Sequence, residues 1–196
     1  LILKKIKIDD ILVYSNSSNI KLLKKANTYK YKRKVFFIKT KNINSKEIEN
    51  QVTSLKSKYI LFSGYSAEIV KNSNLFNKNL IHCHPGLLPK YKGSTVMYYS
   101  LILDSEIFVS IFKISKEIDS GKLLFTKKVK PPKIISKIEN EFDCKIRSKT
   151  LVSFMLQKHK KKLKKRKTNN ATFYYISHPV IRNILINPLK IIKNII

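Results

Sequence analysis

The stretch Leu80-Ile-His-Cys-His-Pro-Gly-Leu-Leu-Pro-Lys-Tyr-Lys-Gly93 decides the fold of this 196-residue chain. Its apolar start predicts a strand that runs into two histidines and then into a loop punctuated by proline and glycine. In open α/β sheets, ligands bind where strands end and loops begin. Imidazole changes its charge near neutral pH, so His82 and His84 are candidates for proton transfer or for metal binding.

The rest of the chain alternates between short apolar runs and segments with helix-like spacing. Further strands are expected at residues 10–15, 34–39, 59–62, 107–114 and 122–126, and helices near 20–26, 46–55, 96–103 and 136–165. This alternation predicts βαβ units, and therefore an α/β fold with a mainly parallel sheet flanked by helices.

The sequence predicts one main domain over residues 1–130 and a short helical C-terminal appendage over 131–196. In the appendage, apolar residues recur at helix-like spacing beside basic residues from Ile181 to Ile196. The favoured interpretation is a helix packed on the body of the protein or on a second subunit, which would make a homodimer. A helix lying on a membrane surface is the less favoured alternative, because Pro188 interrupts the pattern.

The net charge of +29 is the most unusual feature of the composition. Such a charge usually indicates nucleic acid or an anionic surface as partner. However, only four of the 41 basic residues are arginine, and the lysines occur throughout the chain. A chain-wide bias explains this pattern better than a recognition patch, so nucleic acid is not a favoured partner, and the lysine-rich stretch 159–167 is interpreted as a solvated helix end.

The two cysteines, Cys83 and Cys144, form no disulfide framework, which fits a reducing compartment. The N-terminal residues lack an apolar run as long as a signal peptide or a membrane span. A cytoplasmic location is therefore expected. Cys83 alternates with the two histidines along the predicted strand, so a buried small apolar residue is favoured there over a nucleophile.

A polar loop at residues 116–121 carries a second chemical group of interest, the carboxylate of Asp119. This loop follows His84 by a predicted helix and strand, which could return it to the same edge of the sheet. A carboxylate beside an imidazole orients the ring and raises its pKa, as a general acid or base requires. The glycines at 64, 86, 93 and 121 all lie in predicted turns, where a ligand could approach backbone amides.

Taken together, residues from about 10 to 128 resemble the folate-dependent formyltransferases, which include glycinamide ribonucleotide, methionyl-tRNA and nucleotide-amino-sugar formyltransferases. His84-Pro-Gly-Leu-Leu-Pro-Lys-Tyr-Lys-Gly93 resembles the family motif His-Pro-Ser/Gly-Leu-Leu-Pro-x-Tyr-x-Gly. Asp119-Ser120-Gly121 resembles its Asp-x-Gly, and Phe62-Ser-Gly-Tyr65 its strand end before the pteridine loop. Each motif alone is weak, but the ordered set is specific.

This resemblance implies a Rossmann-like formyltransferase fold and transfer of a formyl group from 10-formyltetrahydrofolate to an amine. A small metabolite, such as a nucleotide-linked amino sugar, is the expected acceptor, because no β-rich domain for tRNA follows residue 131. The resemblance assigns His84 and Asp119 to the catalytic positions. The implied cofactor-binding residues are Gly64, Tyr65, Ile69, Val70, Glu117, Ile118 and Gly121.

The chain departs from the family pattern at residue 82, where the family has an asparagine that donates to the oxyanion. His82 is expected on the same face of the strand as His84, so its N–H could replace that donor. The family also begins with an earlier βα unit, which is expected to be missing or shortened in this chain.

Two alternative functions follow from these residues. The first is a catalytically weakened or silent family member that acts by binding, because the oxyanion donor is altered. The second is a metal-dependent hydrolase that uses His82, His84 and Asp119 as ligands; it is the less favoured one, because His-x-His is a short and common pattern.

Overall fold

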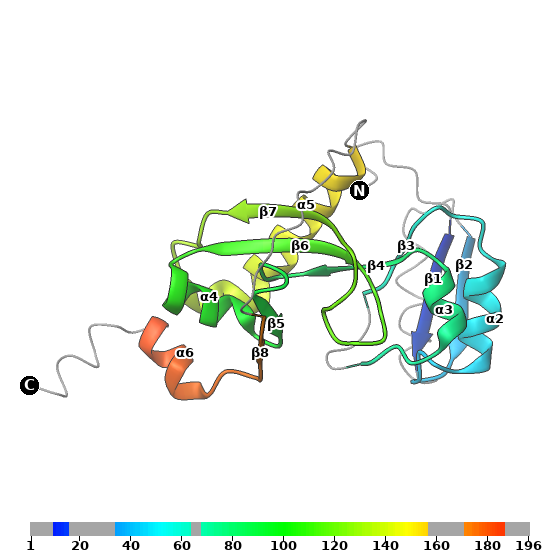
Figure 1. Ribbon diagram of the computed structural model, residues 1–196, viewed down its shortest axis with the longest axis horizontal. Coiled ribbons are helices and arrows are strands. Elements are labelled where there is room, and N and C mark those ends of the chain that lie inside the picture. The colour runs from blue at the N-terminus through cyan, green and yellow to red at the C-terminus, as the bar shows by residue number, and fades with distance from the viewer. Residues whose placement is uncertain (1–9, 16–33, 64–67, 157–170, 187–196) are drawn as a thin grey trace, which may run out of the picture. The chain divides into compact units, whose positions relative to one another are not determined.

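The computed structural model describes residues 10–15, 34–63, 68–156 and 171–186 (Figure 1). The chain divides into two compact units, residues 1–80 and residues 81–196. The helix expected near residues 20–26 and the predicted ligands Gly64 and Tyr65 lie outside the described residues.

Unit 1 is built from a parallel strand pair and two helices. Strand β1 (Asp10–Ser15) pairs in parallel with β2 (Lys34–Lys39), as their expected positions predict. The helix expected at residues 46–55 is α2 (Lys46–Ser54), and it begins where the Ser45 side chain accepts a hydrogen bond from the N–H of Ile48. Strand β3 (Ile60–Leu61) and helix α3 (Ser73–Asn77) complete the unit.

Unit 2 is organised around three neighbouring strands, β4 (Leu80–His84), β6 (Ile107–Lys113) and β7 (Leu123–Val129). Strand β6 is antiparallel to both of its neighbours. The α/β class is confirmed, and the strand pairing is mixed rather than parallel throughout. A short loop joins β6 to β7 and suffices for an antiparallel return, whereas a parallel neighbour needs a long crossover.

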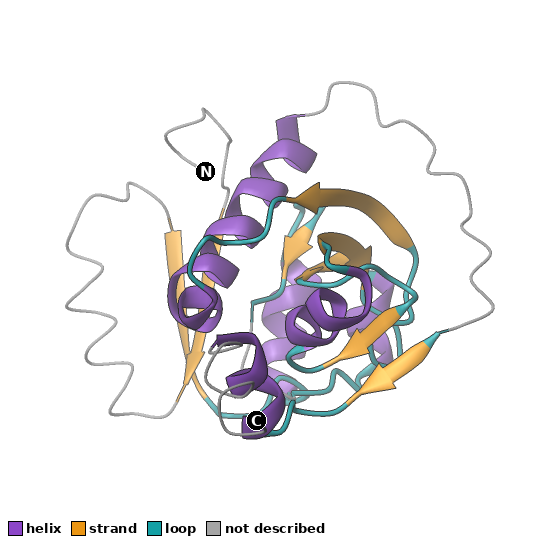
Figure 2. Ribbon diagram, turned by 90° about the vertical axis from the view of Figure 1, so that its left-hand side faces the viewer, coloured by secondary structure: helices purple, strands orange, loops and turns teal. Residues whose placement is uncertain are grey.

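Two helices pack on the strands of unit 2. Helix α4 (Val96–Asp104) contacts β6, and α5 (Asp143–Leu156) contacts β6 and β7. Figure 2 shows the helices of the chain in purple and its strands in orange. The rings of Phe125 in β7 and Phe154 in α5 have centroids 6.0 Å apart. The long helix expected from residue 136 starts with a 3₁₀ turn, η2 (Ile135–Lys137), and a π-helical turn, η3 (Ile138–Phe142), before α5. Residues 157–170, with the lysine-rich stretch, lie outside the described residues.

The C-terminal part of unit 2 packs against a strand from the middle of the chain. Strand β8 (Thr172–Tyr174) pairs in parallel with β5 (Tyr91–Gly93), and Figure 1 shows the two side by side. Helix α6 (Pro179–Ile186) follows, and the expected helix beyond it, with Pro188, lies outside the described residues. Of the helices that the structure describes, none has the length and apolar character to cross a membrane.

Candidate functional site

Strand β4 carries both histidines on one face. His82 pairs with Phe112 of β6, and His84 pairs with Ser110. Directly opposed residues of an antiparallel pair project on the same side, so the two histidines share a face, as their spacing predicts. Cys83 projects to the other side, where its thiol lies 3.5 Å from the carbonyl oxygen of Arg147. Burial raises the pKa of Cys83 to about 12, as expected for an inert buried thiol rather than a nucleophile.

The loop after His84 is fixed from β6 by Ser110, which is fully buried. The Ser110 hydroxyl donates a 2.6 Å hydrogen bond to the carbonyl oxygen of Gly86 and accepts a 3.1 Å bond from the N–H of Leu88. Gly86 also makes room for the histidine, since a Cβ at this position would lie 2.7 Å from Nε2 of His84. The Pro-Gly-Leu-Leu sequence therefore forms a loop that closes tightly over the imidazole.

The hydrogen bonds of the His84 ring decide where it holds its exchangeable proton. Its Nε2 lies 2.8 Å from the carbonyl oxygen of Tyr91, and a carbonyl can only accept, so Nε2 carries a hydrogen. Its Nδ1 lies 3.5 Å from Oδ2 of Asp119. Burial lowers the pKa of His84, while the charge of Asp119 and the Tyr91 carbonyl oppose this shift. The proton that His84 gains or loses is therefore the one on Nδ1, next to a carboxylate.

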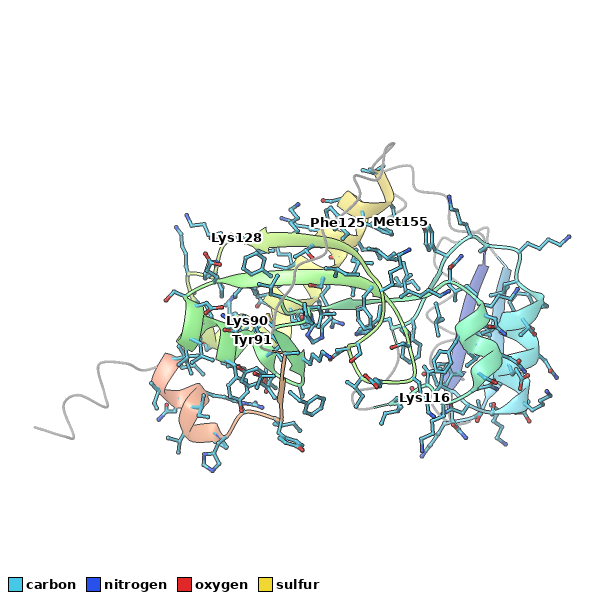
Figure 3. All side chains as sticks on the ribbon, in the orientation of Figure 1. Lys90, Tyr91, Lys116, Phe125, Lys128 and Met155 are labelled. Carbon is cyan, nitrogen blue, oxygen red and sulfur yellow. The ribbon has the colours of Figure 1, made fainter. Side chains whose placement is uncertain are left out.

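Asp119 is held in turn by the backbone of β5. Its Oδ2 accepts a 2.8 Å hydrogen bond from the N–H of Gly93, and its own φ of 51° lies in the left-handed region. The next residue, Ser120, accepts a 2.7 Å bond from Nζ of Lys92. Figure 3 labels Tyr91, the first residue of β5. The expected proximity of His84 and Asp119 is thus observed, and three consecutive β5 residues maintain it.

His82 lies beside His84 but in a different environment. It is partly buried, and its ring meets that of Phe112 edge to face, with centroids 6.0 Å apart and an angle of 85°. The carboxylate of Asp143, at the start of α5, is a further acidic group near both histidines. Burial raises the pKa of Asp143, whereas Arg147, His84 and His82 act to lower it. Arg147 also forms a 2.7 Å ion pair with Asp143.

The predicted cofactor-binding residues fall into both units. Ile69, which is exposed, and Val70, which is buried, belong to unit 1. Glu117, Ile118 and Gly121 belong to the β6–β7 loop of unit 2, where Ile118 is 42% exposed.

The β6–β7 loop turns back closely on the end of β6. A Cβ on Gly121 would lie 1.6 Å from the carbonyl oxygen of Lys113, so only glycine allows this turn. The loop therefore exposes an apolar side chain and backbone polar groups beside Asp119.

The geometry gives no support to a shared metal position. Within the described ranges, no group of three or more His, Cys, Asp or Glu side chains is arranged to hold a metal ion. Nε2 of His84 is engaged with a carbonyl oxygen, and its Nδ1 faces Asp119. These contacts of the His84 ring argue against the metal-dependent hydrolase.

Ser110, Asp143 and the backbone groups of β5 are functional candidates that the sequence analysis missed. A signal for Ser110 was present, because it is the hydroxyl residue inside an otherwise apolar run, Ile107-Phe-Val-Ser-Ile-Phe112. Asp143 carried no comparable signal, because it lies inside the helix expected over residues 136–165, and the start of α5 at this residue was not predicted. The backbone groups of Tyr91 and Gly93 had none, because every residue except proline carries both groups.

Comparison with known proteins identifies the family. A sequence profile of the formyl transferase family matches residues 1–145. The chain is 29% identical over 135 residues to methionyl-tRNA formyltransferase from Finegoldia magna, a match covering 68% of this chain and 44% of that protein. It is 31% identical over 100 residues to the same enzyme from Thermotoga maritima, covering 50% and 32% of the two chains.

Solved structures share the fold at lower sequence identity. The formyltransferase PseJ from Anoxybacillus kamchatkensis aligns with a TM-score of 0.53 at 15% identity, covering 85% of each chain. A sugar N-formyltransferase from Shewanella sp. aligns with a TM-score of 0.52 at 18% identity, covering 86% of this chain and 77% of that one. The chain spans less than half the length of the curated relatives it matches. Because the family profile covers well over half of its residues, this protein belongs to the formyl transferase family.

Proposed function

We propose that the protein transfers a formyl group from 10-formyltetrahydrofolate to a primary amine, with His84 and Asp119 moving the proton. One observation carries this proposal: Nδ1 of a buried histidine faces a carboxylate at 3.5 Å, while a carbonyl fixes the opposite nitrogen. An imidazole oriented in this way can accept and return a proton at a single atom. Formyl transfer requires such an exchange, because the attacking amine loses a proton and the departing folate nitrogen gains one.

Two side chains stabilise the charges that develop during the reaction. When Nδ1 of His84 becomes protonated, the negative charge of Asp119 stabilises the resulting imidazolium. His82, on the same face of β4, supplies a ring N–H to the negative charge that develops on the formyl oxygen. Its contact with the Phe112 ring limits how far the imidazole can turn.

The β6–β7 loop fits the folate donor, which supplies the formyl group. The loop presents the apolar side chain of Ile118 beside the backbone of Glu117 and the turn at Gly121. An apolar surface next to backbone donors and acceptors suits a flat heteroaromatic ring with a polar edge. PseJ, which shares the fold, was solved with tetrahydrofolate. We therefore propose Glu117, Ile118 and Gly121 of unit 2 as folate contacts. Ile69 and Val70 of unit 1 stay predictions from the family resemblance alone.

Two acceptors remain to be compared. The small-metabolite prediction followed from the expectation of a helix and a short tail after residue 131, whereas the matched curated relatives are methionyl-tRNA formyltransferases. We propose methionyl-tRNA as the first acceptor to test. A nucleotide-linked amino sugar is the second, because PseJ was solved with such a nucleotide sugar.

The test measures tetrahydrofolate released from 10-formyltetrahydrofolate in the presence of each acceptor. His84→Asn and Asp119→Asn should each lower the rate by about 100-fold or more, because each removes a group that moves the proton. The matched control is Glu141→Gln, which also removes a carboxylate charge, at an exposed side chain that pairs with Lys137. Release that required an amine and survived His84→Asn would overturn the assigned role. No release with either acceptor would count against the proposed activity.

A further inference from the structure

We propose that residues 172–182 are a positioning clamp for the His84–Asp119 pair, an inference that rests on the proposed formyl transfer. The clamp consists of β8, the turn that contains Ser177, and the first half of α6. It lies beyond residues 1–145, the stretch matched by the family profile. Its effect on the pair passes through β5.

Strand β5 supplies the groups that orient the pair. The carbonyl of Tyr91 accepts the hydrogen bond from His84, and the N–H of Gly93 donates to Asp119. Between them, Lys92 holds Ser120, the neighbour of Asp119. The position of this three-residue strand therefore determines the separation of imidazole and carboxylate.

Strand β8 is the strand partner of β5 in the part of the chain that the structure describes. The N–H of Thr172 donates to the carbonyl oxygen of Lys90 at 3.2 Å, and the N–H of Ser94 donates to that of Tyr174 at 3.0 Å. These bonds hold the backbone on both sides of β5. The approach is close at Gly93, where φ is 99° and a Cβ would lie 2.1 Å from the Tyr174 carbonyl oxygen.

Side chains reinforce the backbone pairing. The ring of Tyr174 packs on those of Tyr91 and Tyr99, with centroids 5.4 Å and 4.5 Å away. Just beyond β8, the N–H of Ser177 donates a 2.7 Å bond to the hydroxyl of Thr95. Aromatic packing and this part-buried hydrogen bond both favour one register of β8 against β5.

Arg182, in the first half of α6, holds the C-terminal end of the clamp in place. Its Nε donates to the hydroxyl of the buried Ser177 at 2.9 Å, and its guanidinium pairs with Glu139 at 2.9 Å. It also lies over the ring of Tyr98, 5.4 Å from the centroid. These partners lie outside the His84–Asp119 pair, so any effect of Arg182 on catalysis must pass through the chain. Arg182 is therefore a positioning residue.

Without β8, Lys90 and Ser94 would lose the bonds that hold Tyr91 and Gly93 in place between them. A misplacement of about 1 Å in a catalytic arrangement can cost about 100-fold in rate. The clamp thus maintains the proton-transfer geometry from a segment distant in sequence. Folate contacts in the β6–β7 loop would be affected less, because the loop is also closed on β6 at Gly121.

Two proline variants of β8 test this role. Thr172→Pro removes the N–H that donates to Lys90, whereas Phe173→Pro alters the adjacent residue. In a parallel pair, alternate residues of a strand bond to a given neighbour, so the N–H of Phe173 points away from β5. The two variants place the same rigid ring in the same strand, and only one removes a bond to β5.

Two measurements separate positioning from loss of structure. The first is turnover, where Thr172→Pro should lower kcat by about 10- to 100-fold with a smaller change in KM. The second is the hydrogen exchange of the His84 Nε2–H, followed by NMR with nitrogen-15-labelled histidine and assigned with His84→Asn. This bond is buried, so exchange should be slow in the wild type and in Phe173→Pro, and at least about tenfold faster in Thr172→Pro. The exchange measurement needs no turnover, so it tests the clamp even if formyl transfer is not found.

A remote variant decides the outcome if Thr172→Pro fails to fold. Arg182→Gln removes the contacts to Ser177 and Glu139, and it should accelerate the His84 exchange and lower kcat in the same direction. Its control is Lys137→Gln, which makes the same charge change at the exposed pair with Glu141. Slow exchange and unchanged kcat in both Thr172→Pro and Arg182→Gln would overturn the clamp. An equal loss of kcat and of slow His84 exchange in Lys137→Gln would also overturn the clamp. Both losses would then depend on the removed charge rather than on the contacts of Arg182.

Discussion

Replacing Gly86 by alanine tests whether the imidazole of His84 needs the space that this glycine leaves. The added Cβ would lie 2.7 Å from Nε2 of His84 and 2.8 Å from Cγ2 of Val96. Ordinary van der Waals contact begins at 3.4 Å, so each neighbour must move by roughly 0.6–0.7 Å. His84 and Val96 are both buried, so neither can move freely.

The two displacements have different consequences. Overpacking of a close-packed interior costs about 1–3 kcal/mol of stability. A shift of the imidazole lengthens its 2.8 Å bond to the Tyr91 carbonyl and changes its approach to Asp119. Because a misplacement of about 1 Å can cost about 100-fold, the rate should fall by about 10- to 100-fold in Gly86→Ala.

A second substitution separates packing from catalysis. Val96→Ala removes Cγ2, so the double variant Gly86→Ala/Val96→Ala relieves one of the two clashes and leaves the clash with His84. Urea unfolding should show part of the lost stability restored relative to Gly86→Ala, after correction for Val96→Ala alone. Tetrahydrofolate release should stay low. Full activity in Gly86→Ala, or activity that recovers together with stability, would refute the reasoning that His84 is positioned by this contact.

Three further predictions concern charge and buried hydrogen bonds. Ser110→Ala leaves two loop groups unpaired and should cost about 1–3 kcal/mol in urea unfolding, whereas Ser148→Ala, at an exposed serine, should change stability by less than about 0.5 kcal/mol. Burial lowers the pKa of His84 from 6.5, so the unfolded chain binds the proton more readily than the folded one. The free energy of unfolding should therefore fall as pH drops below about 6.5, and His84→Asn should weaken this pH dependence. His82→Asn should raise kcat if the imidazole is a poor oxyanion donor, and a lower kcat would instead identify His82 as adapted to this site.

Hydrogen bonding lowers the pKa of Glu49 in unit 1 to about 2, chiefly through the side chains of Asn72 and Asn74. The native carboxylate therefore releases its proton more readily than the unfolded one. Its contribution to stability is present above its ordinary pKa of 4.5 and is lost as pH falls toward about 2. A carbon-13 NMR titration should give a low pKa for Glu49, and Asn72→Ala should raise it. An ordinary pKa would contradict the hydrogen-bond geometry.

Sequence patterns predicted the elements that depend on local chemistry. Strands β1 and β2 follow from short β-branched and aromatic runs, and the start of α2 from Ser45, whose hydroxyl caps the helix. The antiparallel return from β6 to β7 was not predicted, because the direction of pairing depends on how the chain packs and not on strand composition. The π-helical turn before α5 was also unexpected, since it interrupts a stretch with regular helical spacing.

For the candidate site, side chains were easier to predict than the groups that position them. His84 and Asp119 could be proposed as partners because imidazole and carboxylate have distinctive chemistry. Their orientation depends on the carbonyl of Tyr91 and the N–H of Gly93, and such groups occur along the whole backbone. Strand β8 was also not predicted, because three residues are too few to show the alternation of apolar and polar side chains that indicates a strand.

The motif from His84 to Gly93 can therefore be understood as one physical unit rather than as a catalytic residue with a neutral loop. Within ten residues it contains the imidazole, the glycine that makes room for it, and the β5 backbone that bonds both partners. Asp119 is the distant member, and it is brought in by that same backbone. Since β5 is only three residues long, its stability must come from elsewhere, and β8 provides a paired neighbour. Weakening the pairing of β8 with β5 would then change the distance between His84 and Asp119, while both side chains remained chemically intact.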